Sequence, residues 1–234
     1  MRLALATLTV TCLLPGMAAA QEGSADDQLR RAREARATWD ESFPGFTADL
    51  VIQMDSAATR GKVQVSPEGD VAVEAPEGQA RAWAVEQLRS EVLHHRARPS
   101  PFGAQAEFAE PEGKHPLGRL IRLEGDRMGS SYRIAGDQIR EVNRTMGGEK
   151  FSIKVLLSRK NAEGKYLPEV FTVTYWDAAT GDLKKVETFS VSYIRLGRYD
   201  LPATRTQVVS EDKDAPVRRL ELSNHRLGGA AASP

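Results

Sequence analysis

Three runs of the sequence decide the fold: KFSIKVLLS at residues 150–158, EVFTVTYWD at residues 169–177 and LKKVETFSVSYIR at residues 183–195. In each run, bulky apolar side chains mostly alternate with Ser, Thr, Lys or Glu. Successive side chains of a strand point to opposite faces of a sheet, so the alternation indicates strands with one buried face. Because buried parallel strands are apolar almost throughout, it also favours an antiparallel sheet.

The same pattern continues on both sides of these runs, and glycine-containing turns separate its segments. The alternation predicts further strands at residues 46–55, 62–66, 70–74, 119–124, 129–135, 138–145, 199–210 and 216–226. Pro67-Glu68-Gly69 predicts a hairpin turn. Residues 99–118 are rich in proline and glycine and predict a long surface loop around one short strand.

Two segments have helical spacing instead. Ser24-Ala25-Asp26-Asp27 has the S-x-x-D form of a capping box, and it predicts a helix of about four turns that reaches Ser42 and includes Trp39. Residues 79–98 predict a second helix, on which Trp83 belongs to the apolar face.

About eleven strands and two helices exceed what a sandwich of ~100 residues holds. We therefore expect a mainly β (α+β) fold in which a large curved antiparallel sheet or half-open β-barrel carries both helices against its concave face. Residues 21–227 predict a single β-rich domain. The tail at residues 228–234, GGAAASP, predicts disorder.

The first twenty residues, MRLALATLTVTCLLPGMAAA, have the form of a secretory signal peptide, with cleavage expected after Ala20. The mature protein is thus expected in the periplasm or outside the cell. The apolar segment of the signal peptide is too short to span a bilayer, which needs ~20 apolar residues. No stable membrane insertion is therefore expected. Cys12 leaves open a second interpretation, in which the cysteine is lipidated.

Composition and motifs argue against nucleic-acid binding, metal binding and catalysis. The formal net charge is +0, which argues against electrostatic binding of nucleic acid. His94 and His95 are adjacent, so on a helix they point about 100° apart and do not form a zinc site. The sequence has no G-x-S-x-G, S-x-x-K or glycine-rich phosphate loop. We therefore expect no enzyme, no metal and no cofactor, with an unrecognised hydrolase as the remaining alternative.

The apolar faces of the strands suggest a ligand. A curved sheet of this size has a concave interior that two short helices need not fill, and such interiors hold apolar ligands. We expect non-covalent binding of a lipid or a lipoprotein acyl chain, by a carrier or sensor, and the predicted lining is Trp39, Leu50, Ile52, Trp83, Phe171, Val173, Phe189 and Val191. The alternative is a cell-envelope scaffold with a packed core and no small ligand.

Three motifs carry a family resemblance: Trp39-Asp40, FPGFTAD at residues 43–49 and GRYDLP at residues 197–202. With them the chain resembles a family of exported proteins known only as a domain of unknown function. The order of its elements is more distantly similar to periplasmic lipoprotein carriers of the LolA and LolB type. That resemblance implies a half-open barrel that binds acyl chains under helical lids; no ligand residue of those carriers matches a residue of this chain.

Overall fold

A computed structural model of the protein describes residues 23–96, 105–110 and 115–228. These residues form two helices, α1 (Ala25–Glu34) and α2 (Gln79–His95), and twelve strands. The strands are β1 (Phe46–Met54), β2 (Ala57–Val65), β3 (Val71–Glu74), β4 (Gln105–Phe108), β5 (Arg119–Glu124), β6 (Ser131–Ala135), β7 (Gln138–Met146), β8 (Glu149–Lys160), β9 (Tyr166–Asp177), β10 (Leu183–Leu196), β11 (Tyr199–Ser210) and β12 (Val217–Leu227). The predicted signal peptide, and all of the predicted tail except Gly228, lie outside the described residues.

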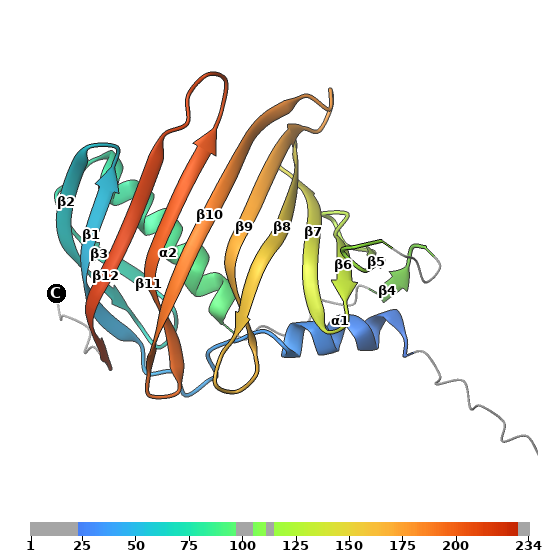
Figure 1. Ribbon diagram of the computed structural model, residues 1–234, viewed down its shortest axis with the longest axis horizontal. Coiled ribbons are helices and arrows are strands. Elements are labelled where there is room, and N and C mark those ends of the chain that lie inside the picture. Colours follow the sequence, from blue (N-terminus) through green and yellow to red (C-terminus); the bar gives the residue numbers. More distant parts are fainter. Residues whose placement is uncertain (1–22, 97–104, 111–114, 229–234) are drawn as a thin grey trace, which may run out of the picture.

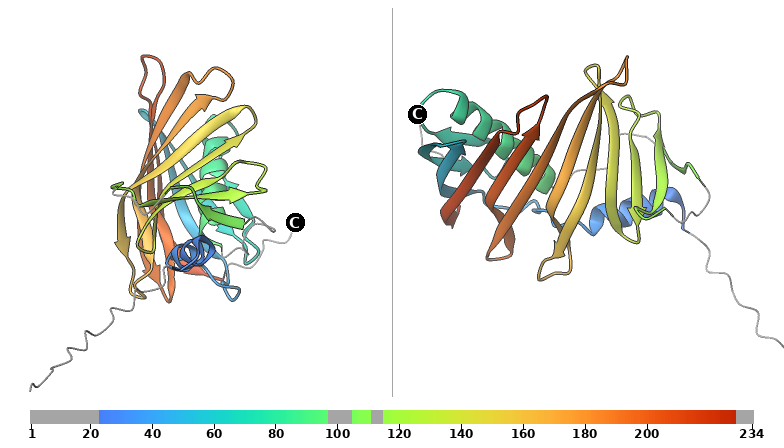
Figure 2. Two further views of the ribbon diagram at one scale, coloured as in Figure 1. Left: turned by 90° about the vertical axis from the view of Figure 1, so that its right-hand side faces the viewer. Right: turned by 45° about the horizontal axis from the view of Figure 1, so that its top comes forward.

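All twelve strands belong to one antiparallel sheet, ordered β3-β2-β1-β12-β11-β10-β9-β8-β7-β6-β5-β4 (Figure 1). The sheet is curved, and both helices lie on its concave side (Figure 2). The predicted fold class, a mainly β protein with a large curved antiparallel sheet and two helices, is confirmed. The sheet is open among the described residues, with β3 and β4 at its two edges.

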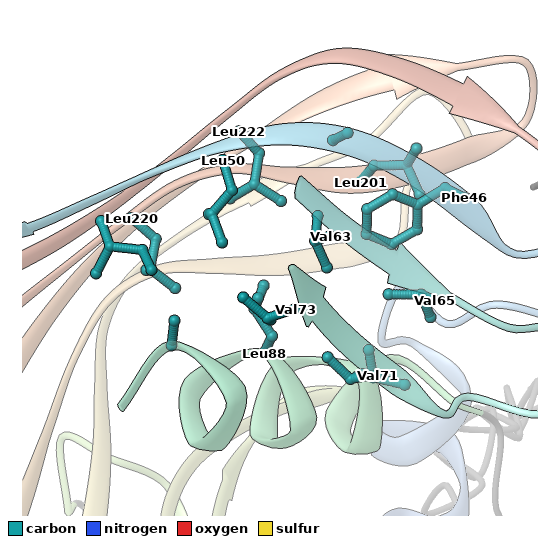
Figure 3. Packing of buried hydrophobic residues seen from close by; sticks show 14 of the residues in the cluster. Phe46, Leu50, Val63, Val65, Val71, Val73, Leu88, Leu201, Leu220 and Leu222 are labelled. Carbon is teal, nitrogen blue, oxygen red and sulfur yellow. The ribbon is translucent and has the colours of Figure 1, made fainter. Parts of the chain in front are cut away.

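The larger of two hydrophobic cores lies under α2. Strand β12 pairs with β1 so that Leu222 faces Leu50 and Leu220 faces Ile52. These residues share one hydrophobic cluster with Leu88 of α2, and Figure 3 shows Leu50, Leu220 and Leu222 on the sheet above that helix. We call this cluster the α2 core. Its buried members are Trp39, Phe43, Phe46, Ala48, Leu50, Ile52, Val63, Val65, Val71, Val73, Trp83, Ala84, Leu88, Val92, Tyr199, Leu201, Leu220 and Leu222.

The smaller core lies under α1, and we call it the α1 core. Its buried members are Ala25, Leu29, Ala32, Ala106, Ile121, Leu123, Tyr132 and Ile134. The predicted cap is present, since the Ser24 hydroxyl accepts the Asp27 N–H at 3.1 Å. Asp26 also accepts the N–H of Ala106 at 3.0 Å, so the helix occupies a donor of edge strand β4.

The predicted length of α1 is wrong, because the helix ends at Glu34. The chain then becomes extended: Ala37 donates its N–H to the Tyr166 carbonyl, and Tyr166 donates its own to Ala35. Trp39 consequently lies in this extended segment, where its N–H donates to the His95 carbonyl. Tertiary hydrogen bonds to β9 and α2 thus replace the last two predicted turns of the helix.

Other boundaries differ less. Helix α2 ends at His95 rather than residue 98, and β2 begins at Ala57 rather than residue 62. The predicted hairpin turn joins β2 and β3, with the Ser66 N–H donating to the Asp70 carbonyl. The predicted short strand within residues 99–118 is β4.

Candidate functional site

The concave face of β8 and β9 lies between the two helices. Helix α2 packs against β1 and β3, whereas α1 packs against β4, β6 and β7. Four apolar side chains of this intervening face are partly exposed and pack against neither core: Phe151, Ile153, Val155 and Phe171. We call these four residues the apolar strip. They are the described apolar side chains best placed to contact a ligand on the concave face.

Buried side chains of β9 and β10 border the strip. The ring of Phe171 stacks on that of Phe189, with centroids 4.8 Å apart. Val173 pairs with Ile153 across β8 and β9, so it continues the same face. Val191 follows Phe189 on that face of β10 and pairs with Arg205 of β11. Four of the eight predicted lining residues, Phe171, Val173, Phe189 and Val191, therefore lie together at or beside the strip.

The other four predicted lining residues, Trp39, Leu50, Ile52 and Trp83, are buried in the α2 core. Both indole N–H groups are already used: Trp39 donates to the Asp200 carbonyl at 2.9 Å, and Trp83 donates to the Gln207 side chain at 2.8 Å. These residues fix α2 and the segment before β1 to the sheet. The structure thus separates the predicted lining into a packed group and a group at the strip.

A buried polar cluster joins α2 to the sheet beside the strip. Its buried members are Gln87, Glu91, His95, Arg205 and Gln207, and the partly exposed Tyr193 lies beside them. The guanidinium of Arg205 donates to Glu91 at 2.7 Å and to Gln87 at 3.0 Å. The second carboxylate oxygen of Glu91 lies 3.1 Å from Nε2 of His95. Since Gln87, Glu91 and His95 are spaced four apart, one face of α2 carries all three.

The charges within this polar cluster are matched. Burial by itself raises the pKa of Glu91, but the hydrogen bond with His95 and the charge of Arg205 outweigh burial and lower it to about 2. Burial, assisted by the charge of Glu91, raises the pKa of the Tyr193 hydroxyl well above its usual value. Glu91 is therefore a carboxylate at neutral pH, and it compensates the buried charge of Arg205.

Arg205 also forms the boundary between the polar cluster and the strip. Its guanidinium lies 4.5 Å from the ring centroid of Phe189 and 5.6 Å from that of Phe171. Both distances are within the range of cation–π attraction. The rings of Phe171 and Phe189 are therefore held in place by the charge of Arg205, which Glu91 of α2 neutralises.

The two adjacent histidines have different surroundings. The His95 ring is buried and stacks on Trp39, with centroids 5.0 Å apart, and its Nδ1 has no hydrogen-bond partner. His94 is exposed, and its ring nitrogen bonds to the Ser90 carbonyl. Among the described residues, no three His, Cys, Asp or Glu side chains come together as ligands for a metal ion would.

Two surface depressions lie away from the strip. One, of about 410 Å³, is lined by residues of β1, β2, β3 and β12, including Lys62 and Asn224. The other, of about 360 Å³, lies between the β2–β3 turn and α2 and includes Arg89 and Arg96. None of the eight predicted lining residues borders either depression within the part of the chain that the structure describes.

The buried polar cluster is the main feature that the sequence analysis missed. A signal for it was present, since polar residues recur at every fourth position along an otherwise apolar helix face: Gln87, Glu91 and His95. Their partner Arg205 lies 114 positions from Glu91 and could not be paired with it by spacing alone. No helix in the described ranges is long and apolar enough to cross a membrane.

Comparison with solved structures finds two similar chains at 13% identity. One is a LolA superfamily protein from Nitrosomonas europaea, with a TM-score of 0.37, 88% of this chain covered and 94% of that chain. The other is a putative outer membrane lipoprotein-sorting protein domain from Vibrio parahaemolyticus, with a TM-score of 0.39 and coverages of 90% and 95%. A third, MucB in complex with MucA(peri), is 12% identical, with a TM-score of 0.23 and coverages of 88% and 100%.

Comparison with curated proteins finds no match. A family model, described as a protein of unknown function (DUF3386), matches residues 20–227 and includes all three motifs that carried the family resemblance. The predicted relation to a family of unknown function is therefore confirmed, and the chain belongs to the DUF3386 family.

Proposed function

We propose that this protein binds a lipid or another long-chain apolar molecule non-covalently on the concave face of its sheet, outside the cytoplasm, as a carrier or sensor. The observation that carries the proposal is the apolar strip, whose side chains are partly exposed although both helices lie on the same side of the sheet. The secretory form of residues 1–20 supports a location outside the cytoplasm. The role requires no catalytic residue.

Burial alone can supply the binding energy. Removing apolar surface from water contributes about 25 cal/mol per Å². The three strip residues of β8 alternate along the strand, so from Phe151 to Val155 they span ~13 Å at ~3.3 Å per residue. An extended acyl chain along them would cover a continuous apolar surface, which continues across β9 to Phe171.

The direct test is Ile153→Gln with Lys154→Gln as its matched control. Ile153 belongs to the strip, whereas Lys154 is the next residue of β8 and is exposed on the opposite face. A ligand along the strip would bury the exposed part of Ile153, and the loss of this apolar contact weakens binding by about 1.5 kcal/mol, or roughly tenfold. We expect fluorescent fatty-acid titration to show this loss for Ile153→Gln and not for Lys154→Gln.

Mass spectrometry of organic extracts from the natively purified protein would identify the cargo. A stoichiometric lipid from the wild type, reduced in the Ile153→Gln extract, is the expected result. Extracts that stay empty after incubation with membrane lipids, together with equal titrations of both variants, contradict the proposal.

The alternative is an envelope scaffold without a small ligand. It is favoured by two observations: half of the predicted lining is packed in the α2 core, and Leu156 and Leu157 of β8 are about half exposed. A scaffold would show empty extracts and a stable protein partner that Leu156→Ser or Leu157→Ser releases.

A further inference from the structure

Arg144 lies at the end of the apolar strip. It is on β7, directly opposite Phe151 of β8, and cross-strand partners share a face of the sheet. Its guanidinium donates to the hydroxyl of Tyr132 at 3.0 Å. Tyr132 is buried in the α1 core, so this bond holds the Arg144 side chain on the concave face.

The charge of Arg144 has no carboxylate within ion-pair distance among the residues that the structure describes. Its Nε is buried and has no hydrogen-bond partner. One carboxylate influenced by this charge is Asp126, whose pKa is lowered mainly by hydrogen bonds from Ser130 and only lastly by the charge of Arg144. Its oxygens already accept the N–H groups of Ser130 and Met128. The guanidinium therefore retains donor capacity that no side chain of this region takes up.

Two other cations beside the strip are paired with carboxylates. Arg205 bonds to Glu91 at 2.7 Å, and Lys185 bonds to Glu187 at 2.8 Å. Leaving a partly buried guanidinium without a counter-charge is costly, whereas a carboxylate or phosphate group matches its planar donors well. The contrast with Arg205 and Lys185 indicates that the missing acceptor of Arg144 comes from outside the chain.

We propose that Arg144 binds the anionic head group, a carboxylate or a phosphate, of an amphiphile whose hydrocarbon chain lies along the apolar strip. This inference rests on the proposed function and specifies how the ligand is oriented on the sheet. The head group lies at β7 beside Tyr132, and the chain runs from Phe151 past Val155 toward Phe171. An acyl chain that carries no anion would use the strip but not Arg144.

Three probes with the same oleyl chain test the proposal: oleate, oleoyl lysophosphatidic acid and the uncharged oleyl alcohol. We expect the intact protein to bind at least one of the two anions about tenfold or more tightly than the alcohol, as one charge-assisted pair is worth about 1.5–3 kcal/mol. Tighter binding of oleate identifies a carboxylate head group, and tighter binding of oleoyl lysophosphatidic acid identifies a phosphate head group. A higher salt concentration should weaken binding of the anionic probes and leave binding of oleyl alcohol unchanged.

The variant Arg144→Gln should remove the preference for the anion and leave binding of oleyl alcohol unchanged. Arg144→Lys should restore part of the preference. The control is Arg122→Gln, since Arg122 is exposed on the other face of β5. Its preference should equal that of the wild type.

The outcomes separate the two proposals. Equal binding of all three probes by the wild type, or a preference that survives in Arg144→Gln, overturns the assignment of Arg144 and leaves lipid binding standing. Failure of all three probes to bind overturns lipid binding itself, and the assignment of Arg144 with it.

Discussion

Glu91 and Arg205 form an ion pair in which both side chains are buried. Such a pair contributes little net stability when intact, but removal of one partner leaves a buried charge without compensation. Here the pair also connects α2 to β11 and holds Arg205 against the rings of Phe189 and Phe171. The main role of the ion pair is therefore to fix the position of α2 on the sheet.

Glu91→Gln should lower the free energy of unfolding by about 3–5 kcal/mol at neutral pH, because Arg205 then remains charged and unpaired. Urea unfolding followed by tryptophan fluorescence measures this loss. Glu86→Gln, an exposed change on the same helix, is the control and should have an effect below about 0.5 kcal/mol. Equal effects of the two variants would show that the ion pair is dispensable.

The same residue predicts a pH dependence. The pKa of Glu91 is about 2 in the folded protein and ordinarily 4.5, so the unfolded chain takes up the proton first as the pH falls. The stabilisation from Glu91 is complete above the ordinary value and is lost as the pH falls toward 2. Unfolding titrations of Glu91→Gln should therefore vary less over this interval than those of the wild type.

The roles of individual site residues were harder to predict from the sequence than the strands and helices. Period-two alternation placed Phe171, Val173, Phe189 and Val191 in the predicted lining. It identified Phe151, Ile153 and Val155 as strand residues but not as lining. The polar cluster did not follow, because its bonds join α2 to residues more than a hundred positions away. Arg144 was missed for the same reason: its environment depends on β6 and β8 together.

Among the elements, the entry into β1 depends on a glycine. Gly45 has φ +77°, and a Cβ placed there would lie 2.3 Å from the carbonyl oxygen of Val65. Both the left-handed backbone and this close approach exclude other residues. The FPGF sequence thus places Phe46 at the start of β1, opposite Val65 and Leu227.

Gly45→Ala should destabilise the protein by more than about 1 kcal/mol, since it combines backbone strain with a steric clash. Thermal unfolding measures the change. Gly181→Ala is the matched control: its φ is +80°, but no atom lies within 4 Å of the added Cβ, so it carries only the backbone strain. Equal losses in both variants would show that the contact with Val65 is unimportant.

Long periodic elements could be predicted, and ends set by tertiary contacts could not. The strands around Phe171 and Phe189 and the helix around Trp83 were identified because each repeats its period several times. The end of α1 was misplaced because residues 35–39 pair with Tyr166 and His95, which no local pattern reveals. Helix propensity is a weak signal when such backbone partners compete.

For the whole molecule, the two cores are parts of one continuous sheet. We expect them to unfold together, because strands β8 to β11 connect them without a break. Leu29→Ala, in the α1 core, should cost about 2–5 kcal/mol and shift the fluorescence transition, although Trp39 and Trp83 lie in the other core. Circular dichroism should give the same midpoint.

Leu88→Ala is the comparison in the α2 core and should shift the same single transition. Separate fluorescence and circular dichroism midpoints in Leu29→Ala would mean that each core unfolds alone. The sequence predicted a curved sheet with helices on one side, but not that β1 pairs with β12. Alternation tells which face of a strand is buried and does not tell which strand is its neighbour.

The pairing of β1 with β12 has a consequence for how the molecule comes into being. Strand β12 lies later in the chain than the other eleven strands, so during synthesis β1 has only β2 beside it until residues 217–227 have emerged. The α2 core lacks Leu220 and Leu222 for the same interval. A long-range pairing of this kind is slow to form and leaves an open strand edge exposed. The edge of β1 that β12 covers therefore stays open until this last strand is available.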